Sequence, residues 1–373
     1  MDSSESGSMM RREHFFVLVT LCLCVLGVIA VYSVDPLRDE GFGPKSFFGR
    51  QILWNAVGWA LFLLFRFSDF QWLFRRSWLW YLLSVLSLGA VLVFGESDET
   101  GARRWLFSRS VQPSEFAKLA LLFFLSSYLS TNRDELDFWS LLVKSAFFVA
   151  VPTLLVFLQP DLGTALVLGV LWFGALFLGG WHRRKLGLLL GLVAGLSPLS
   201  WFIMKDYQRK RILAFLDPWQ DPLGSGYNVV QSQIAIGSGG FLGQGWLSGK
   251  QTQLRFLPAR YTDFIFAAFC EQFGFVGGMV LLTLFILFFW IVLEAAQRVG
   301  NLEERFFASL FGILFLFQVG INVGMNLGIA PVTGIPLPFV SYGGSSLLVH
   351  LAGAGMIARL IWRTEQEERE RWI

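Results

Sequence analysis

The chain has 373 residues, of which 54% are hydrophobic and 15% are charged, and its formal net charge is +3. An ordinary soluble chain has roughly 25% charged residues, and this much apolar surface cannot be buried inside one globule. The composition therefore excludes a soluble protein and indicates an integral membrane protein. The small net charge gives no reason to expect nucleic-acid binding, and three cysteines within apolar runs predict neither a disulfide framework nor a zinc site.

Long apolar runs recur from one end of the chain to the other. A hydrocarbon core about 30 Å thick is crossed by about 20 mostly apolar helical residues. Continuous apolar runs without alternation are typical of helices and not of barrel strands. We therefore predict an all-α polytopic membrane protein with ten transmembrane helices. The predicted helices are Phe15–Val34, Gln51–Phe65, Ser77–Gly95, Pro113–Thr131, Trp139–Leu158, Leu162–Trp181, Leu186–Met204, Phe264–Leu293, Phe306–Ile329 and Ser341–Ala358.

Lys and Arg residues in the connections set the orientation, because cytoplasmic loops are enriched in them. With the N-terminus inside, the inner segments carry fifteen Lys and Arg and the outer segments six, once the long connection at 205–263 is left out. Both termini are therefore predicted in the cytoplasm. The expected parts are a leader at 1–13 (its start solvated or non-native), a ten-helix membrane domain at 14–363 with an extracytoplasmic loop at 205–263, and a tail at 364–373. Basic and then apolar residues at 208–216 predict short interfacial helices in that loop.

Two basic clusters fall on the outer side, where the orientation rule disfavours them. One is Arg103-Arg104 in the 96–112 connection, and the other is Arg209-Lys210-Arg211 in the long loop. These clusters either extend toward anionic lipid headgroups or bind a phosphorylated ligand. The occurrence of two such clusters favours the ligand.

Ionisable residues also occur near the outer ends of several runs. Glu115 and Lys118 are three residues apart on one helix face, so they form either a structural ion pair or a pair facing a polar cavity, which we favour. Asp161 caps the following helix and is placed to line the same cavity. Asp263 precedes the longest apolar run and is either an N-cap or a general base for an outer-leaflet substrate. Glu271, a little over two turns deeper, is a buried network member or a second cavity ligand.

The inner segments are too short for a nucleotide-binding domain, and the phosphate-loop-like stretch at 245–251 has the wrong spacing. A membrane enzyme acting on the outer face therefore needs a substrate that carries its own activation, such as a lipid pyrophosphate.

A series of short motifs follows in order along the chain. They are GARRW at 101–105, QPSE at 112–115, QPDLGT at 159–164, DYQRKR at 206–211, NVVQS at 228–232, TDFIF at 262–266 and GIPLPFVSYGG at 334–344. With these motifs, residues 50–360 resemble the SEDS family (shape, elongation, division and sporulation), and within it the RodA branch. One motif alone is weak evidence, but the complete series is not expected by chance.

The resemblance implies a peptidoglycan glycosyltransferase that polymerises lipid II at the outer face of the bacterial inner membrane, for cell elongation and rod shape, and releases undecaprenyl pyrophosphate. It also implies a class B penicillin-binding protein as the transpeptidase partner. The essential acid of the family corresponds to Asp263. The candidates for substrate binding are Arg103, Trp105, Glu115, Lys118, Gln159, Asp161, Arg209, Arg211, Gln231 and Ser341.

The chemistry agrees with this expectation. One carboxylate suffices to deprotonate a sugar hydroxyl that attacks an anomeric carbon, and a pyrophosphate leaving group needs cations more than an acid. We expect Asp263 to be the base, Arg209, Arg211 and Arg103 to hold the pyrophosphate, and the prenyl tail to lie in a groove between helices. A divalent cation (Mg²⁺ or Mn²⁺) is a further hypothesis that no ligand cluster in the sequence demands. Two alternatives stay open: a lipid II flippase that uses the same cavity, and a scaffold that only recruits partners.

Overall fold

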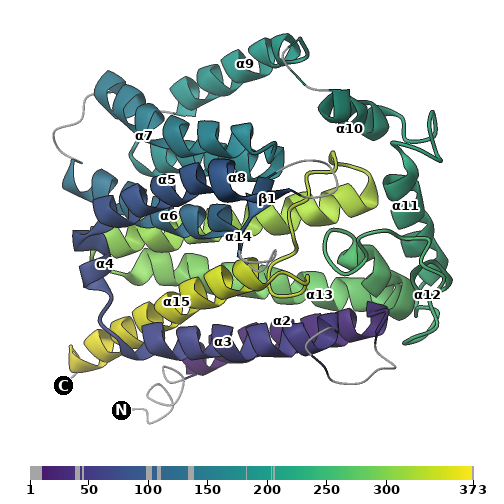
Figure 1. Cartoon of the computed structure of the whole chain (residues 1–373). Helices are drawn as coiled ribbons and strands as arrows, with labels where there is room; N and C mark the ends of the chain where they lie inside the picture. Colours follow the sequence, from purple (N-terminus) through teal and green to yellow (C-terminus); the bar gives the residue numbers. More distant parts are fainter. Residues whose placement is uncertain are drawn as a thin grey trace.

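The computed structural model describes residues 11–37, 43, 46–97, 103–106, 111–132, 138–181, 183–202, 204 and 206–371. This part of the chain is mostly helical (Figure 1), as predicted. Ten of its helices have 17 residues or more and follow the ten predicted runs in order. They are α2 (Arg11–Val34), α3 (Phe47–Phe67), α5 (Ser77–Phe94), α6 (Pro113–Thr131), α7 (Phe138–Leu158), α8 (Leu162–Leu178), α9 (Arg183–Ser200), α13 (Ile265–Arg298), α14 (Leu302–Leu327) and α15 (Gly344–Glu370).

Shorter elements connect the long helices. They are α4 (Gln71–Arg75), α10 (Asp206–Leu216), α11 (Tyr227–Gly239), α12 (Lys250–Gln253) and the antiparallel strands β1 (Glu96–Ser97) and β2 (Arg103–Trp105). The helix α10 covers residues 208–216, where a short interfacial helix is expected, and its position at the membrane interface stays a prediction. The Gly-rich stretch from Gln231 onward begins inside α11. Its glycines Gly239 and Gly243 lie against the backbone of α13.

In the part of the chain that the structure describes, seven helices are long and apolar enough to cross a membrane, namely α2, α3, α5, α7, α13, α14 and α15, and α8 is a shorter apolar helix. Large apolar side chains are exposed along them: Val93 is 66% exposed and Trp290 is 65% exposed. Such surfaces are stable against lipid and not against water. The chain is therefore a multi-pass membrane protein.

The helix α15 forms the centre of the bundle and packs along α3. An added Cβ at Gly344 or Gly355 would collide with Trp54 or with the backbone of Phe62, so these glycines let the two helices approach closely. The helix continues to Glu370, well past the predicted end of the last span at Ala358.

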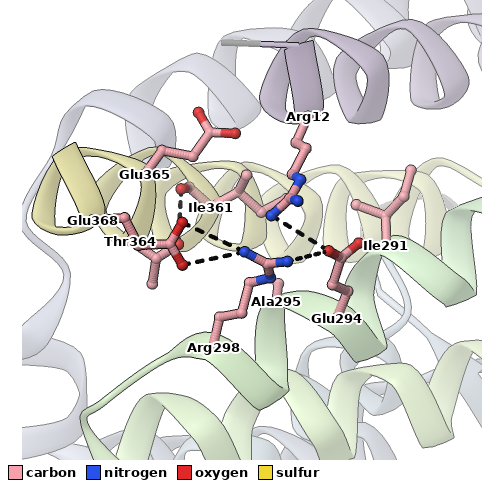
Figure 2. A pocket seen from close by; sticks show the side chains of 9 residues that line it. All are labelled: Arg12, Ile291, Glu294, Ala295, Arg298, Ile361, Thr364, Glu365 and Glu368. Atoms are coloured by element: carbon pink, nitrogen blue, oxygen red, sulfur yellow. Dashed lines mark hydrogen bonds and ion pairs between the residues drawn. The ribbon is translucent and has the colours of Figure 1, made fainter. Parts of the chain in front are cut away.

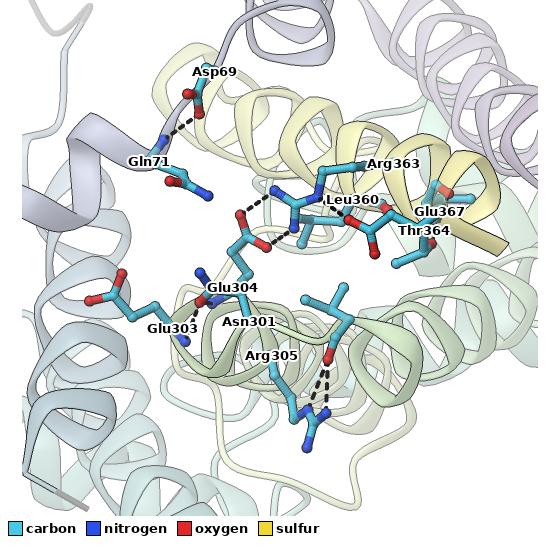
Figure 3. A network of polar contacts seen from close by, with 12 residues as sticks. Asp69, Gln71, Asn301, Glu303, Glu304, Arg305, Leu360, Arg363, Thr364 and Glu367 are labelled. Carbon is cyan, nitrogen blue, oxygen red and sulfur yellow. Dashed lines mark hydrogen bonds and ion pairs between the residues drawn. The ribbon is translucent and has the colours of Figure 1, made fainter. Parts of the chain in front are cut away.

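The start of α2 and the end of α15 lie at the same end of the bundle (Figure 1), which is tied by ion pairs. In a small pocket there, Arg298 of α13 contacts Glu294 at 2.8 Å and Glu368 of α15 at 3.1 Å, and Arg12 of α2 contacts Glu294 at 3.4 Å (Figure 2). Beside it, Arg363 of α15 forms an ion pair with Glu304, the buried carboxylate of α14 (Figure 3). The helices α10, α11 and α12 lie toward the opposite end (Figure 1).

At that opposite end, α13 is interrupted at Gly274, whose φ of 68° is a left-handed conformation. The break frees backbone groups that pair with the loop after α11: Phe275 N–H donates to the carbonyl of Gly240 at 2.9 Å, and Gln244 N–H donates to the carbonyl of Glu271 at 2.9 Å. The longest predicted run is thus two helical pieces, and the first piece is held against the long loop.

Candidate active site

Asp263 lies in the loop that precedes α13, and a second loop holds its neighbours. The Ser341 hydroxyl donates to the carbonyl of Thr262 at 2.6 Å and accepts a hydrogen bond from Leu337 N–H at 2.8 Å. Tyr342 N–H donates to the carbonyl of Tyr261 at 2.8 Å. The loop before α15 therefore fixes the backbone on the N-terminal side of the acid.

Two buried amides of α14 fix the carbonyl of Asp263 itself. The Nδ2 atoms of Asn322 and Asn326 lie 3.1 and 3.0 Å from that oxygen. Asn322 also donates to the carbonyl of Ile335 at 2.8 Å. The main chain of the acid is thus held by two side chains of α14, while the residue itself is only half-buried.

Opposing effects act on the pKa of the Asp263 carboxyl. Burial raises its pKa above the ordinary value, whereas the charges of Arg211 and Arg104 and a hydrogen bond with Thr262 lower it, and Asp161 raises it further. A carboxylate whose pKa moves toward the working pH is a better general base. Gly334 lies alongside with a φ of 74°, and an added Cβ there would be 3.8 Å from Asp263 Oδ2.

Arg104 and Arg211 are the two guanidinium groups that act on Asp263. Arg104 Nη2 donates to the carbonyl of Pro160 at 2.7 Å and its Nε to that of Gln159 at 3.3 Å. Arg211 Nη1 lies 3.4 Å from the carbonyl of Val332. The charges of two arginines from two other segments of the chain thus act on the Asp263 carboxylate.

Asp161 links α8 to this group. Its Oδ1 accepts from Thr164 N–H at 3.1 Å, and its Oδ2 accepts from the Thr164 hydroxyl at 2.9 Å and from Gln112 Nε2 at 3.2 Å. The predicted N-cap is confirmed. Its electrostatic effect on Asp263 also places it near the acid.

Residues 13–366 match the FtsW/RodA/SpoVE family, described as a cell cycle protein. The chain belongs to the FtsW/RodA/SpoVE family. This is the SEDS family of the sequence motifs, so the expected membership is confirmed.

Relatives resemble the chain over most of its length. The peptidoglycan glycosyltransferase MrdB of Escherichia coli (strain K12) is 45% identical over 282 residues, which are 74% of this chain and 75% of MrdB. Stage V sporulation protein E of Bacillus subtilis (strain 168) is 37% identical over 92% of this chain and 95% of its own.

Solved structures agree with the fold. A chain from a peptidoglycan synthase complex, described as coordinating polymerization and crosslinking, has a TM-score of 0.80 and 34% identity over 94% of this chain and 97% of its own. The Rod shape determining protein RodA of Thermus thermophilus has a TM-score of 0.68 and 30% identity over 93% of this chain and 95% of its own.

The basic motif of this FtsW/RodA/SpoVE member places its two arginines differently. Arg103, which we expected at the substrate, is exposed, and its Nη1 lies 3.4 Å from the carbonyl of Leu92. The neighbouring Arg104, which sequence reasoning missed, is the one whose charge acts on the acid. The pairing of β2 with β1 is irregular at these residues, so no simple alternation along the strand predicts which arginine points inward, and the tertiary structure decides it. Trp105 lies opposite Glu96 and is half-buried.

Glu115 and Lys118 form a buried ion pair inside the bundle. Lys118 Nζ lies 2.6 Å from Glu115 Oε1, and the side chains are 1% and 4% exposed. Among the described residues, Glu115 Oε2 has no hydrogen-bond partner. The local ion pair is confirmed, and its contact with a substrate stays a prediction.

For three other predicted residues, the structure describes the burial or the contacts within the protein. Gln159 is buried and donates to the carbonyl of Leu88 at 2.9 Å. Arg209 donates to the carbonyl of Trp201 at 2.9 Å, lies over its ring and contacts Asp206 at 3.6 Å. Gln231 is half-buried on α11. Their roles toward substrate stay predictions.

Glu271 belongs to a buried network, the first of the two roles that the sequence left open. Its carboxylate accepts hydrogen bonds from Gln251 N–H at 2.7 Å, from Thr252 N–H at 3.0 Å and from the Thr252 hydroxyl. It therefore fastens α12 to α13 and stabilises the part of the long loop that leads to Asp263.

An apolar cavity of about 510 Å³ lies between α3, α4, α5 and α6. It begins at Leu106 and Val111, near the strands, and follows α6 from Pro113 to Phe123. Its lining of Trp, Phe and Leu side chains suits a hydrocarbon chain.

The described side chains offer no ligand set for the divalent cation that was considered above. The described residues contain no group of three or more His, Cys, Asp or Glu side chains that could hold a metal ion. Both oxygens of Asp161 are already engaged by Thr164 and Gln112. We assign no step of the reaction to a cation.

Proposed function

We propose that this chain is a peptidoglycan glycosyltransferase that polymerises lipid II. The ten long helices would all be transmembrane in the bacterial inner membrane, with the ion-paired end and both termini in the cytoplasm and Asp263 at the outer face. The domain arrangement predicted above, with a loop at 205–263 between the seventh and eighth spans, belongs to this proposal. It is supported by the family membership and by the charges of Arg104 and Arg211 that act on Asp263.

In the proposed reaction, the Asp263 carboxylate removes the proton from the acceptor sugar hydroxyl. The hydroxyl oxygen then bonds to the anomeric carbon of the donor, and the bond from that carbon to the diphosphate oxygen breaks. The electron pair leaves with the prenyl diphosphate. Arg104 and Arg211 stabilise the negative charge that develops on this leaving group, because one guanidinium group can donate two parallel hydrogen bonds to phosphate oxygens.

The other assigned residues take supporting places in the proposal. Ser341 and Asp161 position the loops around the acid, and Gln159 aligns the carbonyls that hold Arg104. The Glu115–Lys118 pair supports the start of α6. Arg209, Arg103, Trp105 and Gln231 remain candidates for the outer parts of the substrate.

The apolar cavity beside α6 is proposed to hold the prenyl chain. The end of the cavity near the strands, at Leu106 and Val111, adjoins Gln112, which contacts Asp161. A lipid whose diphosphate lies at Arg104 could therefore place its hydrocarbon along α6. A class B penicillin-binding protein would supply the transpeptidase as partner.

The single observation that carries the proposal is a half-buried carboxylate, Asp263, whose main chain is fixed by Asn322 and Asn326 and on which the charges of Arg211 and Arg104 act. A lipid II flippase would use similar charges to pass the headgroup, but it has no need of a general base.

The test incubates purified protein, with and without its partner, with labelled lipid II. Asp263→Asn should abolish glycan polymer, whereas Asp221→Asn, which changes an exposed carboxylate of the same loop, should not. Polymerisation by Asp263→Asn at the unmodified rate would exclude Asp263 as the base. Transfer of lipid II across vesicles without polymer would favour the flippase.

A further inference from the structure

The side-chain amide of Asn326 stands between two backbone groups at the start of α13. Its Nδ2 donates to the carbonyl of Asp263 at 3.0 Å, and its Oδ1 accepts from Ala267 N–H at 3.0 Å. In an α-helix the N–H of each residue pairs with the carbonyl four residues earlier. Ala267 and Asp263 are therefore the partners that would extend α13 by one further bond, and Asn326 engages both.

The orientation of this amide follows from its partners. Its Nδ2 faces two carbonyl oxygens, those of Asp263 and Asn322, the latter at 2.8 Å, and its Oδ1 faces a backbone N–H. Exchanging nitrogen and oxygen would place an acceptor against two acceptors, so only one orientation satisfies the site. Asn326 is fully buried, and its backbone carbonyl accepts a hydrogen bond from the Ser232 hydroxyl of α11 at 2.8 Å.

We propose that Asn326 is a positioning residue that keeps Asp263 out of α13 and thereby directs its carboxyl toward Arg211 and Arg104. This inference rests on the proposed function, in which Asp263 is the base. With the amide in place, the helix begins at Ile265 and Phe264 keeps a non-helical ψ of 25°.

Removing the side-chain amide of Asn326 changes which hydrogen bonds are favourable at the start of α13. The buried Ala267 N–H would lose its acceptor, and an unpaired buried N–H is costly. The nearest remedy is a direct bond to the Asp263 carbonyl, which would draw residues 263 and 264 into helical dihedrals. The direction of a side chain follows the backbone of its residue, so the acid would turn away from the two arginines.

The test compares Asn326→Leu with Gln318→Leu. Gln318 is a matched control because it is also a buried amide of α14, but it contacts His350 of α15 at 2.7 Å. We expect Asn326→Leu to lower kcat by about tenfold or more, as expected for a displaced catalytic group, with KM changed by less than about twofold. The acid limb of its pH–rate profile should also shift, because Asp263 leaves its two arginines. Gln318→Leu should keep both the rate and the acid limb.

A second variant and a structural measurement keep the test decisive. Where Asn326→Leu yields too little folded protein, Asn326→Ala takes its place, and rates are divided by the folded fraction. A cryo-EM structure of the variant should show α13 starting at or before Asp263. An unshifted start of α13, an unchanged kcat and acid limb, or an equal loss in Gln318→Leu would each overturn the proposal. Activity of Asp263→Asn, measured in parallel, tests the base itself and leaves the helix start as an independent result.

Discussion

The Ser341 hydroxyl donates to the main-chain carbonyl of Thr262 across 2.6 Å, and so joins the loop before α15 to the residue that precedes the acid. The two residues are far apart in the sequence. Their contact makes the placement of Asp263 depend on the packing of α15 as well as on α13.

Ser341→Ala should therefore slow the reaction without unfolding the protein. A lost hydrogen bond of this kind costs about 1 kcal/mol, which corresponds to about a fivefold lower kcat if the acid loses its alignment. Steady-state rates with lipid II measure this. Ser309→Ala, on α14, is the control because its hydroxyl also donates to a backbone carbonyl, that of Arg305 at 2.8 Å. Equal effects from both would show that Ser341 has no special relation to the acid.

Arg104 and Arg103 should differ sharply although they are neighbours in the sequence. Arg104→Ala removes a charge that acts on Asp263, and loss of one such stabilising group typically costs about 100-fold in rate. Arg103→Ala, at an exposed position, should lower kcat/KM far less than Arg104→Ala, because Arg103 is a candidate only for the outer parts of the substrate. A larger loss for Arg103 than for Arg104 would reverse the proposed phosphate contacts.

Arg211→Gln should move the acid limb of the pH–rate profile to higher pH. The positive charge of Arg211 lowers the pKa of Asp263, so its removal lets burial raise that pKa further. The base is then protonated at a higher pH, and activity falls earlier on acidification. Arg209→Gln is the matched control on the same helix and should leave the acid limb unchanged.

Asp263→Asn should raise the thermal stability near neutral pH. Burial raises the pKa of Asp263 above its ordinary 3.8, so the folded protein binds this proton more tightly than the unfolded chain does. The protonated carboxyl contributes its full stability at a pH below the pKa of the unfolded chain. This contribution is lost as the pH rises through the higher pKa of the folded protein. The variant carries no such penalty, and each kcal/mol gained should appear as about 2–4 °C in apparent Tm. The gain should vanish near pH 4, which differential scanning in one detergent can measure.

At the ion-paired end, Arg363→Ala should destabilise the protein far more than Arg298→Ala. Arg363 neutralises Glu304, whose side chain is 1% exposed, and breaking a buried pair costs about 3–5 kcal/mol. The pairs of Arg298 are about one third exposed on both sides and are worth about 1 kcal/mol or less. Thermal scans give the comparison. Adding Glu304→Gln to Arg363→Ala should recover part of the loss, because the buried charge is then removed.

The sequence alone determined the membrane class, the helical architecture and the family, because apolar run length and ordered local motifs are properties of contiguous residues. It also predicted Asp263 as the base. The capping role of Asp161 and the Glu115–Lys118 pair were also predictable, since both are contacts within one helical turn. Tertiary structure decided the rest. It placed Arg104 rather than Arg103 where its charge acts on Asp263, and an amide from α14 reached the start of α13 to hold the acid. Such contacts join segments that are distant in the sequence, and a hydrogen bond between them leaves no periodic or local signal in either segment.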